Sequence, residues 1–241
     1  MLIGKDFDKI EISLFGLNFL EPNAFIGDSI ILIVAIVLAF KIRNLSNSIS
    51  FFKNWRYFYL LFGFGMFLGG VGHLMFNYWG FNGKYLPWIF GIICIFFVER
   101  AMLSVLNSKF KLIWGNLSLF KLILVLVLEI GVFYFIDMSK DHSIGLRIPA
   151  INSGIGFIFS LFILGNKYRK ELDKNFVYMI YGVLLLIPSG LFISFKINIH
   201  PWFDKNDFGH LLLILAMFLY FKAIKSYSKT LLKNNPNIID H

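Results

Sequence analysis

The stretch "FIGDSIILIVAIVLAF", residues 25–40, decides the fold, because it is a long apolar run that only one acidic residue, Asp28, interrupts. A helix needs about 20 predominantly apolar residues to cross the hydrocarbon core of a bilayer. Six more apolar runs follow, at about 56–76, 86–105, 117–136, 146–165, 176–195 and 207–223. Backbone groups in lipid must satisfy their own hydrogen bonds, and no sustained alternation typical of barrel strands is present. The sequence therefore predicts an all-α, polytopic membrane protein with a bundle of seven transmembrane helices.

The composition agrees with this fold class. The 241-residue chain is 58% hydrophobic and only 15% charged, whereas about half of a soluble domain is apolar and about a quarter is charged. The single cysteine, Cys94, lies in an apolar run, which excludes a disulfide framework. We expect three parts: a short extracytoplasmic N-terminal segment (1–24), a membrane domain (25–223) and a cytoplasmic tail (224–241).

The distribution of basic residues predicts the orientation. Sixteen of the 23 Lys and Arg residues lie after the first, third, fifth and seventh runs, on one predicted side of the membrane. The positive-inside rule assigns that side to the cytoplasm and the N-terminus to the outside. The net charge of +9 is thereby explained without nucleic acid as a partner, and membrane lipids are the expected partners.

Four ionisable residues are expected to meet in one layer near the outer surface. Ionisable side chains in membrane helices are unfavourable and usually mark function. The predicted topology brings Asp28, His73, Asp207 and His210 to the outer ends of the first, second and seventh helices. We predict that His73 has His210 as its partner, across a metal ion. Two structural interpretations stand beside this one, since Asn206 or Asp207 could cap the seventh helix, and the glycines around His73 could serve helix packing.

The pattern resembles the seven-helix hydrolase superfamily of alkaline ceramidases and progestin and adipoQ receptors, known as CREST. Members carry a serine and a histidine four apart on helix two, an aspartate near helix three and a histidine pair four apart on helix seven. His73 matches the helix-two histidine and His210 the second histidine of the pair. The chain departs from the pattern with Gly69 at the serine, Asn206 at the other histidine and no aspartate near helix three. It is also similar to uncharacterised bacterial seven-helix proteins, so we expect a bacterial inner membrane.

The resemblance implies a zinc-dependent hydrolase that acts on a lipid amide or ester. Catalytic zinc needs about three protein ligands and an open position for water, whose pKa it lowers to about 7. The expected ligands are His73 and His210, with Asp28 as third ligand or orienting carboxylate, and Asp207 is an alternative third ligand. Asp207 and Asn206 would position water or substrate.

Three other functions remain open from the sequence. The missing serine and histidine favour a non-enzymatic sensor that binds a lipid or small molecule. Glu99 and Glu129 leave open a transporter with polar groups along a path across the membrane. A structural partner subunit, whose polar groups hydrogen-bond only one another, is the third. We interpret Glu99, in "FFVERAM", as a Glu–Arg junction at the end of the third helix.

Overall fold

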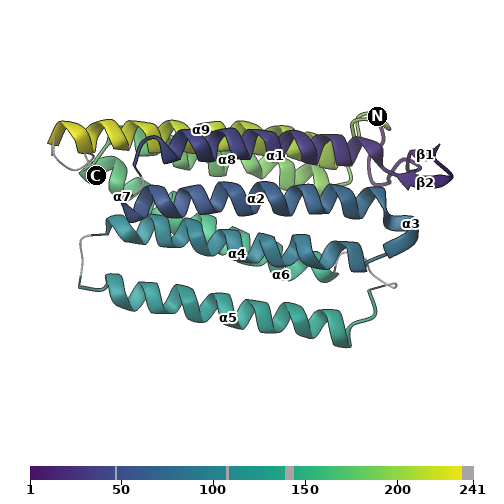
Figure 1. Ribbon diagram of the computed structural model, residues 1–241, viewed down its shortest axis with the longest axis horizontal. Coiled ribbons are helices and arrows are strands. Elements are labelled where there is room, and N and C mark those ends of the chain that lie inside the picture. Colours follow the sequence, from purple (N-terminus) through teal and green to yellow (C-terminus); the bar gives the residue numbers. More distant parts are fainter. Residues whose placement is uncertain (47, 107–108, 139–143, 235–241) are drawn as a thin grey trace.

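The computed structural model describes all residues except 47, 107–108, 139–143 and 235–241, and it confirms an all-α bundle (Figure 1). In the described part of the chain, seven helical spans are long and apolar enough to cross a membrane. Five are single helices: α1 (Pro22–Arg43), α2 (Ser50–Leu74), α4 (Asn82–Val105), α5 (Lys111–Phe135) and α9 (Lys205–Asn234). The other two are composite: α6 (Ile144–Phe157), η1 (Ile158–Leu164) and α7 (Gly165–Glu171) form one, η2 (Lys174–Phe176) and α8 (Val177–Ser194) the other.

Six of the seven spans form a closed ring. Along the ring, α1 packs against α2, α2 against α4, α4 against α6 and η1, η1 against α8, α8 against α9, and α9 against α1. Helix α5 lies outside, where it packs on α4 and α6 and most of its surface is uncovered (Figure 1). The interior that can hold a site is therefore enclosed by six helices, and α5 takes no part in it.

A small hairpin that the sequence did not predict lies in the N-terminal segment. Strands β1 (Glu11–Leu14) and β2 (Leu17–Leu20) pair antiparallel, and Phe15 and Gly16 between them both have positive φ. Two positive-φ residues are what a two-residue hairpin turn of type I′ requires. The short helix α3 (Phe76–Trp79) lies beside it, at the same end of the bundle (Figure 1).

Two helices extend further at the basic end than the sequence predicted. Helix α2 begins at Ser50 rather than near Arg56, and the predicted tail boundary after Ala223 falls inside α9. Both extensions carry aromatic residues that pack together, with ring centroids of Phe51 and Tyr227 5.0 Å apart. Burial of these rings stabilises helical turns whose lysines and asparagines had indicated a loop. Residues 235–241 of the predicted tail lie outside the described residues.

Close backbone contacts fix α1 and α4 on either side of α2. A Cβ atom at Gly72 would lie 2.3 Å from the carbonyl oxygen of Gly83, and one at Gly70 would lie 3.0 Å from Cα of Phe25. Small residues at such crossings let membrane helices approach closely. The glycines near His73 therefore do serve helix packing, as one of the two interpretations expected.

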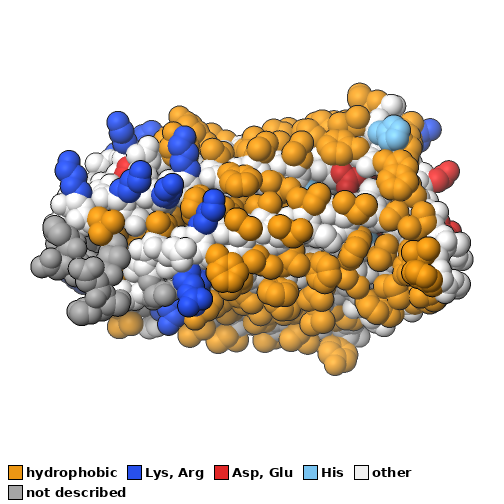
Figure 2. Space-filling view, turned by 45° about the horizontal axis from the view of Figure 1, so that its top comes forward, with side chains coloured by type: hydrophobic (Ala, Val, Ile, Leu, Met, Phe, Trp, Pro, Cys, Tyr) orange, Lys and Arg blue, Asp and Glu red, His pale blue; other side chains and the backbone are white. Residues whose placement is uncertain are grey.

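The charges divide the molecule into two ends. Lys and Arg side chains gather at the end where α1 and α9 finish, while hydrophobic side chains cover the middle (Figure 2). The positive-inside rule assigns this basic end to the cytoplasm. The hairpin and the start of α9 belong to the opposite, outer end (Figure 1).

Candidate functional site

A cavity of about 490 Å³ lies inside the ring, in its outer half. Its walls are largely apolar, with Phe62 and Met66 from α2, Trp88 from α4, and Leu186 and Leu213 from α8 and α9. Its polar side chains come from several helices: Asp28, His73, Lys84, Ser153, Ser189, Asn206 and His210. We call this space the inner cavity.

The inner cavity brings together four residues that the sequence had singled out. Asp28, His73, Asn206 and His210 all line it, although they come from α1, α2 and α9. Nδ1 of His210 lies 3.6 Å from Oδ1 of Asp28, which is too long for a hydrogen bond. Both atoms are buried without a hydrogen-bond partner among the described residues. Buried polar groups are normally hydrogen-bonded, so these two atoms are available to a ligand or water.

Lys84 is a member of the site that the sequence did not reveal. Its Nζ atom is buried in the inner cavity and has no hydrogen-bond partner among the described residues. From the sequence, Lys84 counts only as one of the basic residues of the outer side. A buried ammonium group is strongly unfavourable unless an anion or an acceptor compensates it. The inner cavity therefore presents an unpartnered donor together with the unpartnered acceptor of Asp28.

His73 makes a direct contact that the sequence did not predict. Its Nδ1 lies 2.7 Å from Oε2 of Glu21, which also accepts from Nζ of Lys9 at 2.8 Å. This direct contact was not predicted from the sequence, and the pairing of His73 with His210 across a metal ion stays a prediction. Glu21 precedes the first membrane helix, so it is not among the ionisable residues that the sequence places within membrane helices.

Glu21 is held ionised in a strained backbone conformation. Burial alone would raise the pKa of Glu21, but the hydrogen bonds and charges of His73 and Lys9 outweigh burial and lower the pKa to about 2. Its φ of 52° lies in the left-handed region, directly before Pro22, where a non-glycine residue is strained. An ionised carboxylate only accepts, so Nδ1 of His73 donates and Nε2 is left for a ligand.

A second, outer cavity of about 250 Å³ lies between the N-terminal segment and the start of α9. His73 and Asn206 line both cavities and so form the boundary between them. Glu21 and Lys9 line only the outer one. The Glu21–His73 pair therefore couples the extramembrane segment to the inner cavity.

Asp207 lies outside the inner cavity and closes a capping box. Oδ1 of Asp204 accepts from the backbone N–H of Asp207 at 3.2 Å, and Oδ2 of Asp207 accepts from the N–H of Asp204 at 2.9 Å. The reciprocal pair satisfies two backbone donors at the start of α9. Asp204 therefore caps the helix, whereas the structural interpretation from the sequence had named Asn206 or Asp207 as the cap. Asp207 also accepts from Asn23, and it does not line the inner cavity.

The described side chains do not form a ready zinc site. In the described ranges, no three His, Cys, Asp or Glu side chains gather as ligands of one metal ion. The Glu21–His73 contact is typical of a histidine whose other nitrogen binds a metal. The cationic side chain of Lys84, however, lines the same cavity as Asp28, His73 and His210. Zinc therefore stays a prediction.

Helices α6 and α8 are only loosely packed against each other beside the inner cavity. Helix α8 packs on η1, whereas it has at most marginal contact with α6, and both helices line the inner cavity. Each carries a proline, Pro149 in α6 and Pro188 in α8, which removes a helix hydrogen bond and favours divergence.

Comparison with known proteins gives a family for this architecture. The family model of a family of unknown function, DUF6962, matches residues 24–229. The chain belongs to this family. The matched region includes most of each of the seven membrane spans and every polar residue that lines the inner cavity. Glu21 lies before the matched region. No curated protein and no solved structure matches the chain.

Proposed function

We propose that the protein binds a lipid in the inner cavity, with a head group that carries both a hydrogen-bond donor and an acceptor oxygen. One observation carries this proposal: Oδ1 of Asp28, Nδ1 of His210 and Nζ of Lys84 are all buried and unpartnered among the described residues, and their side chains line one largely apolar cavity. A head-group donor satisfies Asp28, and a carbonyl or carboxylate oxygen satisfies Lys84. Lipid amides have both groups.

The apolar wall supports a single acyl chain as the other part of the ligand. Ligand pockets usually combine hydrophobic walls with a few polar groups that fix orientation. Here the polar residues lie at the outer end, and Phe62, Met66 and Leu213 line the apolar part. The ligand class agrees with the lipid amide or ester that the CREST resemblance implies. We further propose, from the resemblance to bacterial seven-helix proteins, that the membrane is a bacterial inner membrane.

The test is equilibrium binding of a pyrene-labelled N-acylethanolamine to purified protein in nanodiscs, with empty nanodiscs as background. The matching pyrene-labelled hydrocarbon, which lacks the head group, is the comparison probe. Lys84→Met should weaken ethanolamide binding roughly 10- to 150-fold, because a hydrogen bond to a charged group is worth about 1.5–3 kcal/mol. Hydrocarbon binding should remain at background in both proteins.

Lys5→Met is the matched control, because Lys5 is an exposed outer lysine outside both cavities. It should bind the ethanolamide like the wild type. Lys84→Met should fold at least as stably as the wild type, since it removes a buried unpaired charge. Equal binding of both probes, or equal affinity in the wild type and Lys84→Met, would overturn the proposal.

A second candidate function is hydrolysis of the bound lipid, and the Glu21–His73 pair favours it. A carboxylate that fixes the tautomer of a histidine is the usual arrangement of a general base. Nε2 of His73 would take a proton from water while the water oxygen bonds to the acyl carbon. The C–N or C–O bond then breaks, and the proton passes to the leaving amine or alcohol.

Release of free fatty acid from the ethanolamide, measured by mass spectrometry, tests this second function. Elemental analysis of the same preparation, beside His73→Ala and His210→Ala, tests the zinc prediction. Near-stoichiometric zinc that both substitutions remove would support the predicted ligands. Fatty acid release that His73→Ala leaves unchanged would overturn the role of His73 as base.

A further inference from the structure

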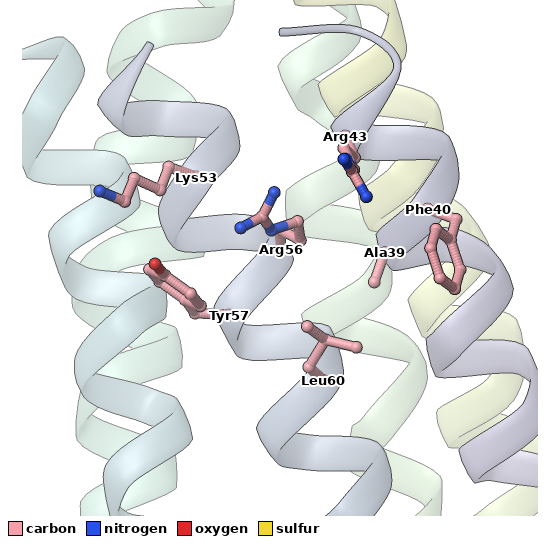
Figure 3. Close-up of a pocket in the computed structure, with 7 residues that line it drawn as sticks. All are labelled: Ala39, Phe40, Arg43, Lys53, Arg56, Tyr57 and Leu60. Carbon is pink, nitrogen blue, oxygen red and sulfur yellow. The ribbon is translucent and has the colours of Figure 1, made fainter. Parts of the chain in front are cut away.

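A basic groove lies between α1 and α2 at the opposite, cytoplasmic end of the bundle (Figure 3). It encloses about 590 Å³ and is lined by seven residues: Ala39, Phe40, Arg43, Lys53, Arg56, Tyr57 and Leu60. Figure 3 shows Arg43 on α1 across from Arg56 on α2, with Lys53 and Tyr57 on the far side of Arg56. The basic groove is separate from both outer cavities, with which it shares no residue.

Two of the three cationic side chains of this groove, Arg43 and Lys53, are not neutralised by acidic side chains of the described chain. Its lining contains three cationic residues and no acidic one. The described acidic residues at this end are Glu99, Glu171 and Asp173, and each has other partners. Glu99 contacts Lys121 and Ser118, Glu171 lies 4.0 Å from Lys167, and Asp173 accepts from Ser226 and Thr230. The exposed Arg43 and Lys53 make no ion pair within the described residues.

An apolar stripe on α1 leads from the membrane to this groove. Its exposed residues recur every three or four positions, which places them on one face of the helix. They are Ile26, Ile30, Ile33, Val37 and Phe40. Phe40 is both the last residue of the stripe and part of the groove lining, and its side chain is exposed. The exposed apolar surface of α1 is therefore continuous with the basic groove.

We propose that the basic groove binds the phosphodiester head group of an anionic phospholipid, with an acyl chain along the α1 stripe. Basic pockets between membrane helices on the cytoplasmic side are suited to anionic head groups. Arginine offers paired N–H donors to phosphate oxygens, and Arg43 and Arg56 approach the groove from two helices. Lysines and arginines that only set the orientation need no common site, whereas these three line one groove together with the apolar residues Ala39, Phe40 and Leu60.

The experiment is native mass spectrometry of detergent-purified protein titrated with dioleoyl phosphatidylglycerol or dioleoyl phosphatidylcholine. The groove variant is Arg43→Gln with Lys53→Gln. The matched control is Arg169→Gln with Lys170→Gln, which removes one exposed arginine and one exposed lysine from the same side of the membrane. The wild type and the control should retain one phosphatidylglycerol in preference to phosphatidylcholine. The groove variant should bind it about 30-fold more weakly, because each basic residue near an anionic surface contributes about 1 kcal/mol.

Each other outcome overturns the proposal. Equal losses in the groove variant and the control would mean that only overall charge attracts the lipid. Displacement of phosphatidylglycerol by millimolar inorganic phosphate would assign the groove to a free phosphate. If the groove variant fails to fold, Arg43→Gln alone is the substitute, because Arg43 is exposed, and undiminished binding by it would count against the site.

Discussion

Nδ1 of His73 lies 2.7 Å from Oε2 of Glu21, so a residue of the extramembrane segment orients a histidine that lines the inner cavity. Glu21 is fixed by its backbone as well, since its N–H donates to the carbonyl of Ile10 at 2.8 Å. The N-terminal segment that precedes α1 therefore contributes to the site.

Loss of the Glu21 charge should destabilise the protein in a pH-dependent way. The pKa of Glu21 is lowered from 4.5 to about 2 in the folded protein, so its contribution is fully present above pH 4.5. That contribution is lost as the pH falls towards 2. Glu21→Gln should lower the free energy of unfolding by about 2 kcal/mol at pH 7, because a hydrogen bond to a charged group is lost. Thermal unfolding in detergent between pH 7 and 3 measures both effects.

Glu171→Gln is the control for this prediction, since Glu171 is exposed in a pair 4.0 Å long. Glu171→Gln should have the same stability as the wild type at pH 7. It should also lose stability below pH 4.5 to the same extent as the wild type. Glu21→Gln should show a weaker acid dependence than either. Identical acid dependence in Glu21→Gln and Glu171→Gln would show that the Glu21–His73 contact does not contribute.

The adjacent glycines Gly69 and Gly70 should respond oppositely to substitution by alanine. A Cβ at Gly70 would lie 2.9 Å from Cβ of Asp28 and 3.0 Å from the α1 backbone, whereas one at Gly69 would lie 3.7 Å from Oδ2 of Asp28. Gly70→Ala should destabilise by about 1–3 kcal/mol through overpacking. Gly69→Ala should be neutral or stabilise by up to about 1 kcal/mol, because alanine favours the helix. Thermal unfolding of both variants in one detergent is the measurement, and equal effects would contradict the close approach of α1 to α2 at Gly70.

Substitution of Lys121 alone should lower the stability of the protein more than substitution of both Glu99 and Lys121. Glu99 is only 4% exposed, and its two oxygens contact Lys121 and Ser118. Lys121→Met leaves a buried carboxylate without its counter-charge, which typically costs about 3–5 kcal/mol. Glu99→Gln with Lys121→Met should recover much of that stability. An additive double variant in thermal unfolding would show that the two side chains are not coupled. Glu99 was predicted to form a Glu–Arg junction at the end of the third helix, whereas its contacts are with Lys121 and Ser118 of α5.

The sequence predicts the membrane fold well because bilayer thickness and loop charge are strong constraints on any chain. The sequence also predicts that Asp28, His73 and His210 lie close together, because the topology places the outer ends of the first, second and seventh helices in one layer. Asn206 joins them because it lies one turn before His210.

The missed residues share a physical reason. Lys84 and Glu21 lie at the membrane boundary, where a charge usually contacts water or serves orientation, and nothing local indicates that either is buried. The partner of His73 depends on how the N-terminal segment folds back over the bundle. Its turn residues, Phe15 and Gly16, lack the Asn-Gly or Asp-Gly signal of a tight hairpin.

The most direct test of lipid binding in the inner cavity is photo-crosslinking with a fatty acid ethanolamide that carries a diazirine in mid-chain. Crosslinked peptides are mapped by mass spectrometry, with and without excess unlabelled ethanolamide. We expect competed crosslinks at the cavity wall, on residues such as Met66, Leu186 and Leu213. Crosslinks confined to lipid-facing residues such as Ile33 and Leu119, and insensitive to competitor, would contradict lipid binding in the inner cavity.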